Sequence, residues 1–443
     1  MNIPATGVMR ARRARTATAS DDDHRRAAIA LASLALLGAA VWASPARAQE
    51  WNPFRDTTSS TTGSSQQAYD RDFVREWEAR PPKGFPTLAA ANIEATKAAI
   101  KRYTDIVARG GWQPIPDVQL ETGSKGPAVA LLRQRLTLSG DLKDVSNYPD
   151  FFDATLEKAV KRFQASNGLS PTGIVDKRTI PALNLPAQAR LKQLQANLPR
   201  LQELARGTAK KYVVVNIPAA QIEAVEGDHV VSRHAGVVGK IDRPSPILKS
   251  SVHELNFNPV WHLPPTVIAK DLIPKGREMQ RAGKSVLTQF GIDAYDGAGR
   301  KLDPAKVDWN SAAAHGLTFK QQPGKENPLG FVKINFDNAY SVYLHSTPSE
   351  SLFGRNFRAA SSGCVRVMGI DQLVTWMLSD NGDWNAERVQ KMKATGERQD
   401  VRLKRPVPLY FAYITAWATE DGIVQFRRDL YQKDGLGAVA ANY

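Results

Sequence analysis

The 443-residue sequence predicts a multidomain α+β protein, in which a small three-helix domain precedes a mainly-β domain that carries a helical or irregular insertion. Two changes of pattern support this prediction. Apolar residues recur at helical spacing as far as about residue 207, and β-branched runs begin near residue 211. A polar stretch rich in glycine, at about 266–320, then interrupts the β pattern. A chain of this length has room for two or three domains.

The N-terminus has the form of an export signal. Residues 1–26 are basic and polar, residues 27–43 form an apolar run, and Ala46-Arg47-Ala48 has the small-x-small form of a signal-peptidase site. We therefore expect residues 1–48 to be a signal peptide. The alternative is an uncleaved anchor, although the apolar run is slightly short for a membrane span. No later stretch is expected to cross a membrane.

The next segments are predicted to be a linker followed by helices. Residues 49–86 contain a polar low-complexity run typical of a linker. Residues 87–116 are predicted to form an N-terminal helical segment, capped by Thr87 and ended by Gly110-Gly111. Residues 187–210 are predicted to be a connecting helix, with leucines at helical spacing.

Residues 117–186 are predicted to form three short helices on one small core. The first helix follows Gly126, the second begins at Asp153, which is a good N-cap, and the third begins near Asp176. The unit resembles the peptidoglycan-binding domain family, mostly at core and turn positions. The other matching positions are Val129, Leu132, Leu136, Thr155, Ala159, Val160, Phe163, Gln164, Gly168, Leu169, Gly173, Thr179, Ala182 and Leu183. The resemblance implies a module that binds the cell wall, or a spacer that has lost this binding.

A meander of short strands is predicted after residue 211, and this part of the chain contains the only cysteine, Cys364. The strands are expected at 212–217, 221–225, 230–231, 234–238, 250–258, 332–336 and 341–345. One thiol cannot form an internal disulfide in an exported protein. Cys364 lies nineteen positions after His345. A lone cysteine with a histidine in reach is a candidate nucleophile–base pair, since the base must help to form the thiolate.

Residues around this pair suggest supporting roles. Tyr343 shares a strand face with His345 because strand side chains alternate. It can hydrogen-bond substrate, support the histidine or simply pack in the core. The backbone amides of Ser362, Gly363 and Cys364 can form an oxyanion hole, and the glycine permits a tight turn.

The stretch from Tyr212 to about Arg405 resembles the L,D-transpeptidase catalytic domain (YkuD-type), whose signature is a histidine followed by Ser-x-Gly-Cys. Flanking motifs resemble more narrowly the large YcbB-like branch of that family. These motifs are Val237-Val238-Gly239-Lys240, Asp242-Arg243-Pro244, Asn258-Pro259-Val260-Trp261, Pro264-Pro265, Gln322-Pro323-Gly324, Asn327, Leu329-Gly330, Lys333, Pro406-Val407-Pro408, Thr415-Ala416-Trp417 and Asp421-Gly422. We expect a catalytic domain at 211–405, with the insertion as a mobile lid or a fixed cap, and a C-terminal segment at 406–443.

The resemblance also implies roles for individual residues. The backbone carbonyl of Ser346 would orient His345, which would explain why serine can stand where this branch often has aspartate. The candidate substrate-binding residues are Arg366, Ser361 and Trp261. Arg366 can recognise a carboxylate or support the loop.

The resemblance implies a reaction as well. Cys364 attacks the carbonyl of the L-centre at the third position of a peptidoglycan tetrapeptide stem, the terminal D-alanine leaves, and a second stem takes the acyl group in a 3→3 cross-link. Carbapenem-type inhibitors are expected to acylate Cys364. The location is expected to be the periplasm, in association with the cell wall. The alternatives are attachment of a protein amine to peptidoglycan, an L,D-carboxypeptidase, a cysteine peptidase and a wall-binding scaffold without activity.

Charge and histidine spacing limit the other partners. The net charge of +15 and pI of about 9.8 indicate an anionic neighbour, such as the wall, a membrane surface or nucleic acid. The basic residues do not alternate with aromatic residues, which argues against nucleic acid. His262 and His315 can line the site, but no histidines have metal-binding spacing. We therefore expect no metal and no cofactor.

Overall fold

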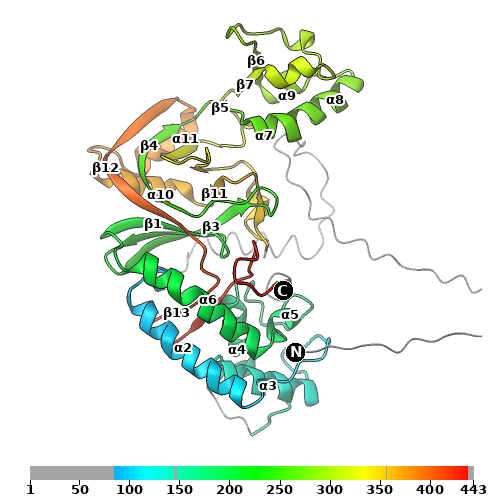
Figure 1. The fold of residues 1–443 in the computed structure, drawn as a ribbon, viewed down its shortest axis with the longest axis vertical. Coiled ribbons are helices and arrows are strands. Elements are labelled where there is room, and N and C mark those ends of the chain that lie inside the picture. The colour runs from blue at the N-terminus through cyan, green and yellow to red at the C-terminus, as the bar shows by residue number, and fades with distance from the viewer. Residues whose placement is uncertain (1–83, 144–146, 356, 438–443) are drawn as a thin grey trace, which may run out of the picture. The chain divides into compact units, whose positions relative to one another are not determined.

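Figure 1 shows the fold in the computed structural model, which describes residues 84–143, 147–355 and 357–437. The predicted signal peptide and nearly all of the predicted linker lie outside the described residues. Helices form the first part of the described chain and a nine-stranded sheet forms most of the later part, so the predicted α+β class is confirmed. No helix within the described ranges has the length and apolar character needed to cross a membrane.

Two long helices pack together and cover one side of the strand region. They are α2 (Ala91–Ala108) and α6 (Ala187–Ala205). Tyr103 of α2 and Leu194 of α6 are buried in one hydrophobic cluster. Gly110 and Gly111, both with positive φ, end the first helix as predicted.

Thr87 does not cap α2, so that prediction is wrong. The helix begins after Ala90 and has no side-chain cap. The Thr87 amide and hydroxyl instead donate to the buried carboxylate of Glu223, at 2.8 and 2.9 Å. Arg233 also donates to this carboxylate, at 3.0 Å. A buried carboxylate needs hydrogen-bond donors, and the Thr87 donors that bond to Glu223 are not available to cap the helix.

Three helices of the predicted binding module surround one apolar core, which includes Leu132, Leu156 and Phe163. They are α3 (Pro127–Ser139), α4 (Ala154–Ser166) and α5 (Ile180–Leu183). The Asp153 carboxylate caps α4 as predicted, by accepting from the Leu156 amide at 2.8 Å. The last helix begins later than predicted, because the Asp176 carboxylate first holds a turn by accepting backbone amides.

The large sheet closes on itself. Its strand order is β10-β3-β11-β9-β8-β4-β12-β1-β2, and β2 also pairs with β3, so eight strands close into a barrel with β10 outside on β3. The strands are β1 (Lys211–Asn216), β2 (Gln221–Glu226), β3 (His229–Gly239), β4 (Leu248–Phe257), β8 (Val332–Phe336), β9 (Leu344–His345), β10 (Ala359–Ser361), β11 (Val365–Val367) and β12 (Gln399–Ala412). Of the strand predicted at 341–345, only Leu344 and His345 form a strand, β9. β12 was not predicted from the sequence.

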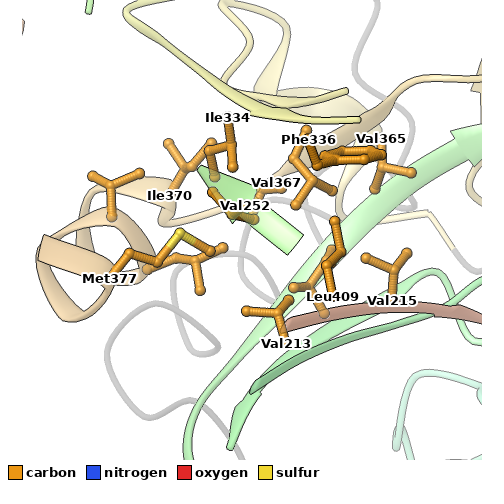
Figure 2. Close-up of a cluster of buried hydrophobic side chains, with 14 of the residues drawn as sticks. Val213, Val215, Val252, Ile334, Phe336, Val365, Val367, Ile370, Met377 and Leu409 are labelled. Carbon is orange, nitrogen blue, oxygen red and sulfur yellow. The ribbon is translucent and has the colours of Figure 1, made fainter. Parts of the chain in front are cut away.

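The interior of this sheet is apolar and extends to the strand that follows Cys364. Figure 2 shows Val213 and Val215 of β1 near Val365 and Val367 of β11, with Met377 beside them. Met377 belongs to α10 (Ile370–Met377), which packs against α11 (Ala386–Thr395). The strand after Cys364 is thus fixed by core packing rather than by surface contacts.

The other face of β1 is also covered. Tyr212 and Val214 pack with Leu201 of α6, which explains why this strand reads as a continuous apolar run instead of an alternation.

The insertion has a small sheet as well as helices, so the prediction of a helical or irregular segment was incomplete. Its strands pair in the order β5-β7-β6. Its own core includes Leu272, Phe290, Trp309 and Phe319. Its elements are β5 (Trp261–His262), α7 (Pro265–Val267), a π-helical turn η1 (Ile268–Leu272), α8 (Ile273–Arg281), α9 (Val286–Phe290), β6 (Ile292–Tyr295), β7 (Thr318–Gln321) and the 3-10 turns η2 (Pro304–Lys306) and η3 (Ala312–Gly316). Strands of two to four residues are too short to show alternation.

The C-terminal segment joins the helices to the sheet. It contains a hairpin of β13 (Ala416–Ala418) and β14 (Val424–Phe426). Phe426 packs on Tyr103 of α2. The Asn197 side chain of α6 donates to the Thr415 hydroxyl at 2.6 Å and accepts from the Thr415 amide at 2.9 Å. Two further 3-10 turns are η4 (Glu350–Leu352) and η5 (Leu378–Asp380).

The insertion core should be sensitive to one added methyl group at Gly276. A Cβ atom there would lie 2.3 Å from the Trp309 ring. We expect Gly276→Ala to destabilise the insertion by about 1–3 kcal/mol through overpacking, as followed by denaturant unfolding with tryptophan fluorescence. Gly297→Ala is the matched control, because nothing lies within 4 Å of its added Cβ. Equal midpoints for the two variants would contradict the packing argument.

Candidate active site

The barrel places Cys364 and His345 on neighbouring segments. Cys364 immediately precedes β11, which pairs in parallel with β9. In that pairing, Arg366 lies opposite His345. A cavity of about 80 Å³ opens here. Seven predicted site residues line it: Trp261, Tyr343, His345, Ser361, Ser362, Cys364 and Arg366.

The imidazole of His345 is almost completely buried and held by a backbone carbonyl. Its Nδ1 lies 2.6 Å from the carbonyl oxygen of Ser346. A carbonyl only accepts, so Nδ1 carries the proton and Nε2 is left as the basic nitrogen. Burial, together with the charges of Arg366 and Lys333, lowers the pKa of His345 to about 3, although the backbone carbonyls of Ser346 and Pro328 act in the opposite direction.

The side chain of Ser346 fastens this carbonyl in place. The hydroxyl donates to the Leu329 carbonyl at 2.9 Å and accepts from the Val332 amide at 3.1 Å. Gly330 lies so close that a Cβ there would approach the hydroxyl oxygen to 2.3 Å, and its φ is +60°. This tight packing gives the serine side chain a structural task that the sequence did not reveal.

Tyr343 lies between Cys364 and the insertion. Its hydroxyl accepts from the Trp261 indole nitrogen at 2.9 Å and also hydrogen-bonds Cys364. Its ring meets that of His345 edge to face, at 5.8 Å between centroids. Trp261 is itself buried in the insertion core. The main role of the indole at the cavity is therefore to hold the Tyr343 hydroxyl in place.

The thiol of Cys364 is half-buried and in its neutral form. Burial raises the pKa of the Cys364 thiol to about 11, although Tyr343 and the charges of Lys333 and Arg366 act in the opposite direction. With the histidine also neutral, the resting pair at neutral pH is a thiol and an imidazole.

Serine hydroxyl groups stabilise the turn before Cys364. Ser361 donates to the Cys364 carbonyl at 2.5 Å and accepts from the Gly363 amide at 3.2 Å. Ser245 donates to the Gly363 carbonyl at 2.7 Å. Gly363 has φ +112°, a region that favours glycine. Ser361 is thus engaged within the turn, and so is the Gly363 amide that the sequence analysis assigned to an oxyanion hole.

Arg243 connects this turn to the insertion, a role that the sequence analysis missed. Its Nη1 donates to the Ser362 hydroxyl and to the Asp271 carboxylate, at 2.8 Å each. Asp271 belongs to η1, and both side chains of the ion pair are largely buried. The sequence marked Arg243 only as part of a motif, and a contact across 119 positions has no local signal.

Two cations lie near the thiol. Lys333 of β8 pairs with His345 across the sheet, and its ammonium lies 4.6 Å from the centre of the Tyr343 ring. Arg366 is completely buried, and this burial lowers its pKa to about 9. From the sequence, Lys333 was predicted only as part of a family motif.

The other histidines singled out by sequence stand apart from the cavity. His262 and His315 are exposed and do not line it. Among the described residues, no three His, Cys, Asp or Glu side chains gather as a metal site would require.

Comparison with known proteins covers both parts of the chain. Residues 210–402 match a family model described as "L,D-transpeptidase catalytic domain", and residues 125–183 match one described as "Putative peptidoglycan binding domain". A Haemophilus influenzae protein described as "Putative L,D-transpeptidase" is 31% identical over 222 residues, which are 50% of this chain and 44% of that protein. The chain thus spans less than half the length of this curated relative.

Solved structures of L,D-transpeptidases are also similar. One from Xylanimonas cellulosilytica is 16% identical, with 68% of this chain and 100% of that chain covered and a TM-score of 0.23. One from Stackebrandtia nassauensis is 14% identical, with 68% and 96% covered and a TM-score of 0.26. Residues 210–402 are thus similar to L,D-transpeptidase catalytic domains, and residues 125–183 are similar to peptidoglycan-binding domains.

Proposed function

We propose that the protein forms 3→3 peptidoglycan cross-links through a thioester on Cys364. The observation that carries this proposal is a half-buried thiol, hydrogen-bonded by Tyr343, in one cavity with a histidine whose Nδ1 is fixed by the Ser346 carbonyl. This arrangement leaves a basic nitrogen for the thiol proton. The catalytic domain itself supports acyl transfer on wall peptides.

Attack begins from the neutral pair. The sulfur of Cys364 bonds to the L-centre carbonyl carbon of the donor stem while His345 Nε2 takes the thiol proton. The carbonyl oxygen becomes an oxyanion, for which the amides of Ser362 and Cys364 are the proposed donors. The Gly363 amide can join them only if it leaves Ser361. Each such donor typically contributes on the order of 10²–10³ in rate.

Collapse of this intermediate releases D-alanine. The carbon–nitrogen bond breaks, and His345 returns the proton to the leaving amine. The side-chain amine of a second stem then attacks the thioester, and His345 takes its proton. The carbon–sulfur bond breaks, and His345 returns the proton to the sulfur, which regenerates the thiol. Tyr343 donates to the sulfur, and the charges of Lys333 and Arg366 favour the thiolate. The complete burial of Arg366 favours this supporting role over direct recognition of a stem carboxylate.

The remaining assignments follow from these contacts. Trp261 holds Tyr343, and Ser361 holds the turn, so we propose that both support the site from within the fold. We propose that Arg243, which is itself held by Asp271 of the insertion, positions Ser362. The peptidoglycan-binding domain, together with the signal-like N-terminal sequence, supports export to the periplasm and work at the cell wall.

The reaction can be tested with the mature protein and purified disaccharide-tetrapeptide, read by mass spectrometry. We expect a cross-linked dimer that has lost one D-alanine, and no product from Cys364→Ala. Tripeptide monomer alone would show that water is the acceptor and would make the protein a carboxypeptidase. Folded wild-type protein that changes no mass would refute the catalytic proposal.

The neutral resting pair predicts that the thiol of Cys364 loses its proton only at high pH. Because the pKa of Cys364 is raised, ultraviolet absorbance of the thiolate should appear only above the ordinary thiol pKa of about 8.5. Lys333→Gln should move the midpoint still higher, since a charge that favours the thiolate is removed. The Cys364→Ser variant supplies the baseline. A thiolate already fully formed at neutral pH would mean that the pair rests as an ion pair instead.

The link from the insertion to the nucleophile turn predicts an effect of Asp271→Asn. Loss of the ion pair should loosen Arg243 from Ser362 and slow acylation by a carbapenem by about tenfold or more, as measured by mass spectrometry. Asp296→Asn is the control, since it breaks an exposed ion pair within the same insertion. Arg243→Lys should resemble Asp271→Asn, because lysine cannot reproduce the fork. Equal acylation rates for the two aspartate variants would contradict the link.

A further inference from the structure

Ser245 holds a peptide group next to the proposed nucleophile. This serine is 2% exposed, and its hydroxyl donates to the Gly363 carbonyl at 2.7 Å. Neither Ser245 nor Gly363 lines the Cys364 cavity, so the serine hydroxyl lies behind the turn and not on the substrate side. Pro244 has a fixed φ, and Pro246 restricts the serine that precedes it. Ser245 is therefore a donor on a stiff segment.

The Gly363 carbonyl and the Cys364 amide belong to one planar peptide group. In a trans peptide the C=O and N–H bonds point in opposite directions, so a donor that fixes the oxygen also fixes the direction of the N–H bond. The oxygen lies toward Ser245, whereas Cys364 lines the cavity. Among the residues that the structure describes, no protein acceptor bonds the Cys364 amide. This amide is therefore available to an oxyanion in the cavity.

Tyr431 of the C-terminal segment holds Ser245 in place. The phenol hydroxyl donates to the Gly239 carbonyl at 2.6 Å and accepts from the Ser245 amide at 3.1 Å. The Ser245 hydroxyl in turn accepts from the Gly239 amide at 2.9 Å. A Cβ atom on Gly239 would lie 2.5 Å from the Ser245 nitrogen, so the end of β3 and the serine are in close contact. These bonds oppose any rotation of the serine away from Gly363.

Tyr431 is itself anchored by a second tyrosine. Its amide donates to the Tyr413 hydroxyl at 2.6 Å, and that hydroxyl donates to the buried Asp429 carboxylate at 2.7 Å. The two rings are stacked, with 5.6 Å between their centroids. The same carboxylate accepts the backbone amides of Lys433 and Asp434, at 2.8 Å each. A series of hydrogen bonds thus connects the C-terminal segment to the peptide group that precedes the thiol.

We propose that Ser245 and Tyr431 are positioning residues that orient the Cys364 amide toward the oxyanion formed during acyl transfer. Both act through the peptide group between Gly363 and Cys364, and neither contacts the substrate. Orientation matters because a hydrogen bond weakens steeply as its angle departs from linear. The inference rests on the proposed function, since it requires a tetrahedral intermediate at Cys364. It gives the C-terminal segment a part in the reaction beyond the packing of its hairpin on α2.

The test compares two reactions of the same thiol in the full-length protein. Acylation by a carbapenem passes through an oxyanion, whereas alkylation by iodoacetamide displaces iodide and forms no oxyanion. We expect Ser245→Ala to slow acylation by about tenfold or more, because a misdirected oxyanion donor loses part of its effect, and to leave alkylation unchanged. Tyr431→Phe should slow acylation less, since the serine hydroxyl remains. Mass spectrometry follows both reactions.

The matched controls lose a buried hydroxyl elsewhere in the same sheet. Ser232→Ala removes a hydroxyl that lies 2.8 Å from His234 Nε2. Tyr212→Phe removes one that donates to the Leu88 carbonyl at 2.9 Å. Both controls should keep the wild-type rates of acylation and alkylation, so they measure the general effect of losing a buried hydroxyl. Circular dichroism checks that every variant is folded.

A double variant tests whether the tyrosine acts through the serine. Ser245→Ala combined with Tyr431→Phe should be acylated about as slowly as Ser245→Ala alone, and additive slowing would contradict the series of bonds. Equal acylation rates for Ser245→Ala and Ser232→Ala, or parallel slowing of acylation and alkylation, would overturn the positioning role. Wild-type protein that iodoacetamide alkylates but the carbapenem does not acylate would instead refute the proposed function, and the inference with it.

Discussion

The hydrogen bond between His345 Nδ1 and the Ser346 carbonyl is the contact on which the proposed catalytic site depends. It fixes the tautomer, and therefore which nitrogen can take the thiol proton. The bond exists because the carbonyl cannot turn away: the Ser346 hydroxyl is fastened to the Leu329–Val332 turn, where Gly330 allows the close approach. The parallel pairing of β9 with β11 then brings the fixed ring to the strand that begins after Cys364. A backbone group thus does the orienting, and the side chain of residue 346 only keeps that group still.

The insertion meets the site through two polar contacts, at Trp261 and at Asp271. Because it has its own hydrophobic core, it can hold its shape while these contacts change. Opening the cavity would require Tyr343 to lose the indole donor, and Arg243 to lose its carboxylate. Both losses alter neighbours of the thiol directly. Whether the insertion is a mobile lid or a fixed cap therefore depends on the strength of these two bonds. Any motion of the insertion would change the surroundings of Cys364.

The features that were predicted correctly from the sequence are those that depend on interactions between neighbouring residues. The cap at Asp153, the glycines that end α2 and the buried run of β1 were readable because each depends on adjacent residues. Thr87 was misread because a buried carboxylate 136 positions away competes for its donors. β12 was missed because Pro406 and Pro408 interrupt its pattern. A register shift between Arg402 and Val407 accommodates Pro406 within the sheet, and Pro408 pairs with Ser251 beyond the shift. The Arg243–Ser362 contact likewise joins distant segments, so only the three-dimensional structure could reveal it.

The same cations act on both halves of the catalytic pair, and their effects fit the two steps of acyl transfer. Lys333 and Arg366 favour the thiolate of Cys364 and disfavour the imidazolium of His345. In the proposed attack, the first effect helps and the second opposes, while burial, the largest cause of both pKa shifts, keeps the resting pair neutral. Once the proton is on the ring, the second effect makes the imidazolium a stronger acid, which in the proposed reaction favours proton transfer to the leaving D-alanine amine. The first effect acts against this expulsion, because the same cations also stabilise the thiolate as the competing leaving group. Expulsion of the amine in the proposed reaction therefore depends on the contacts of the bound donor as well.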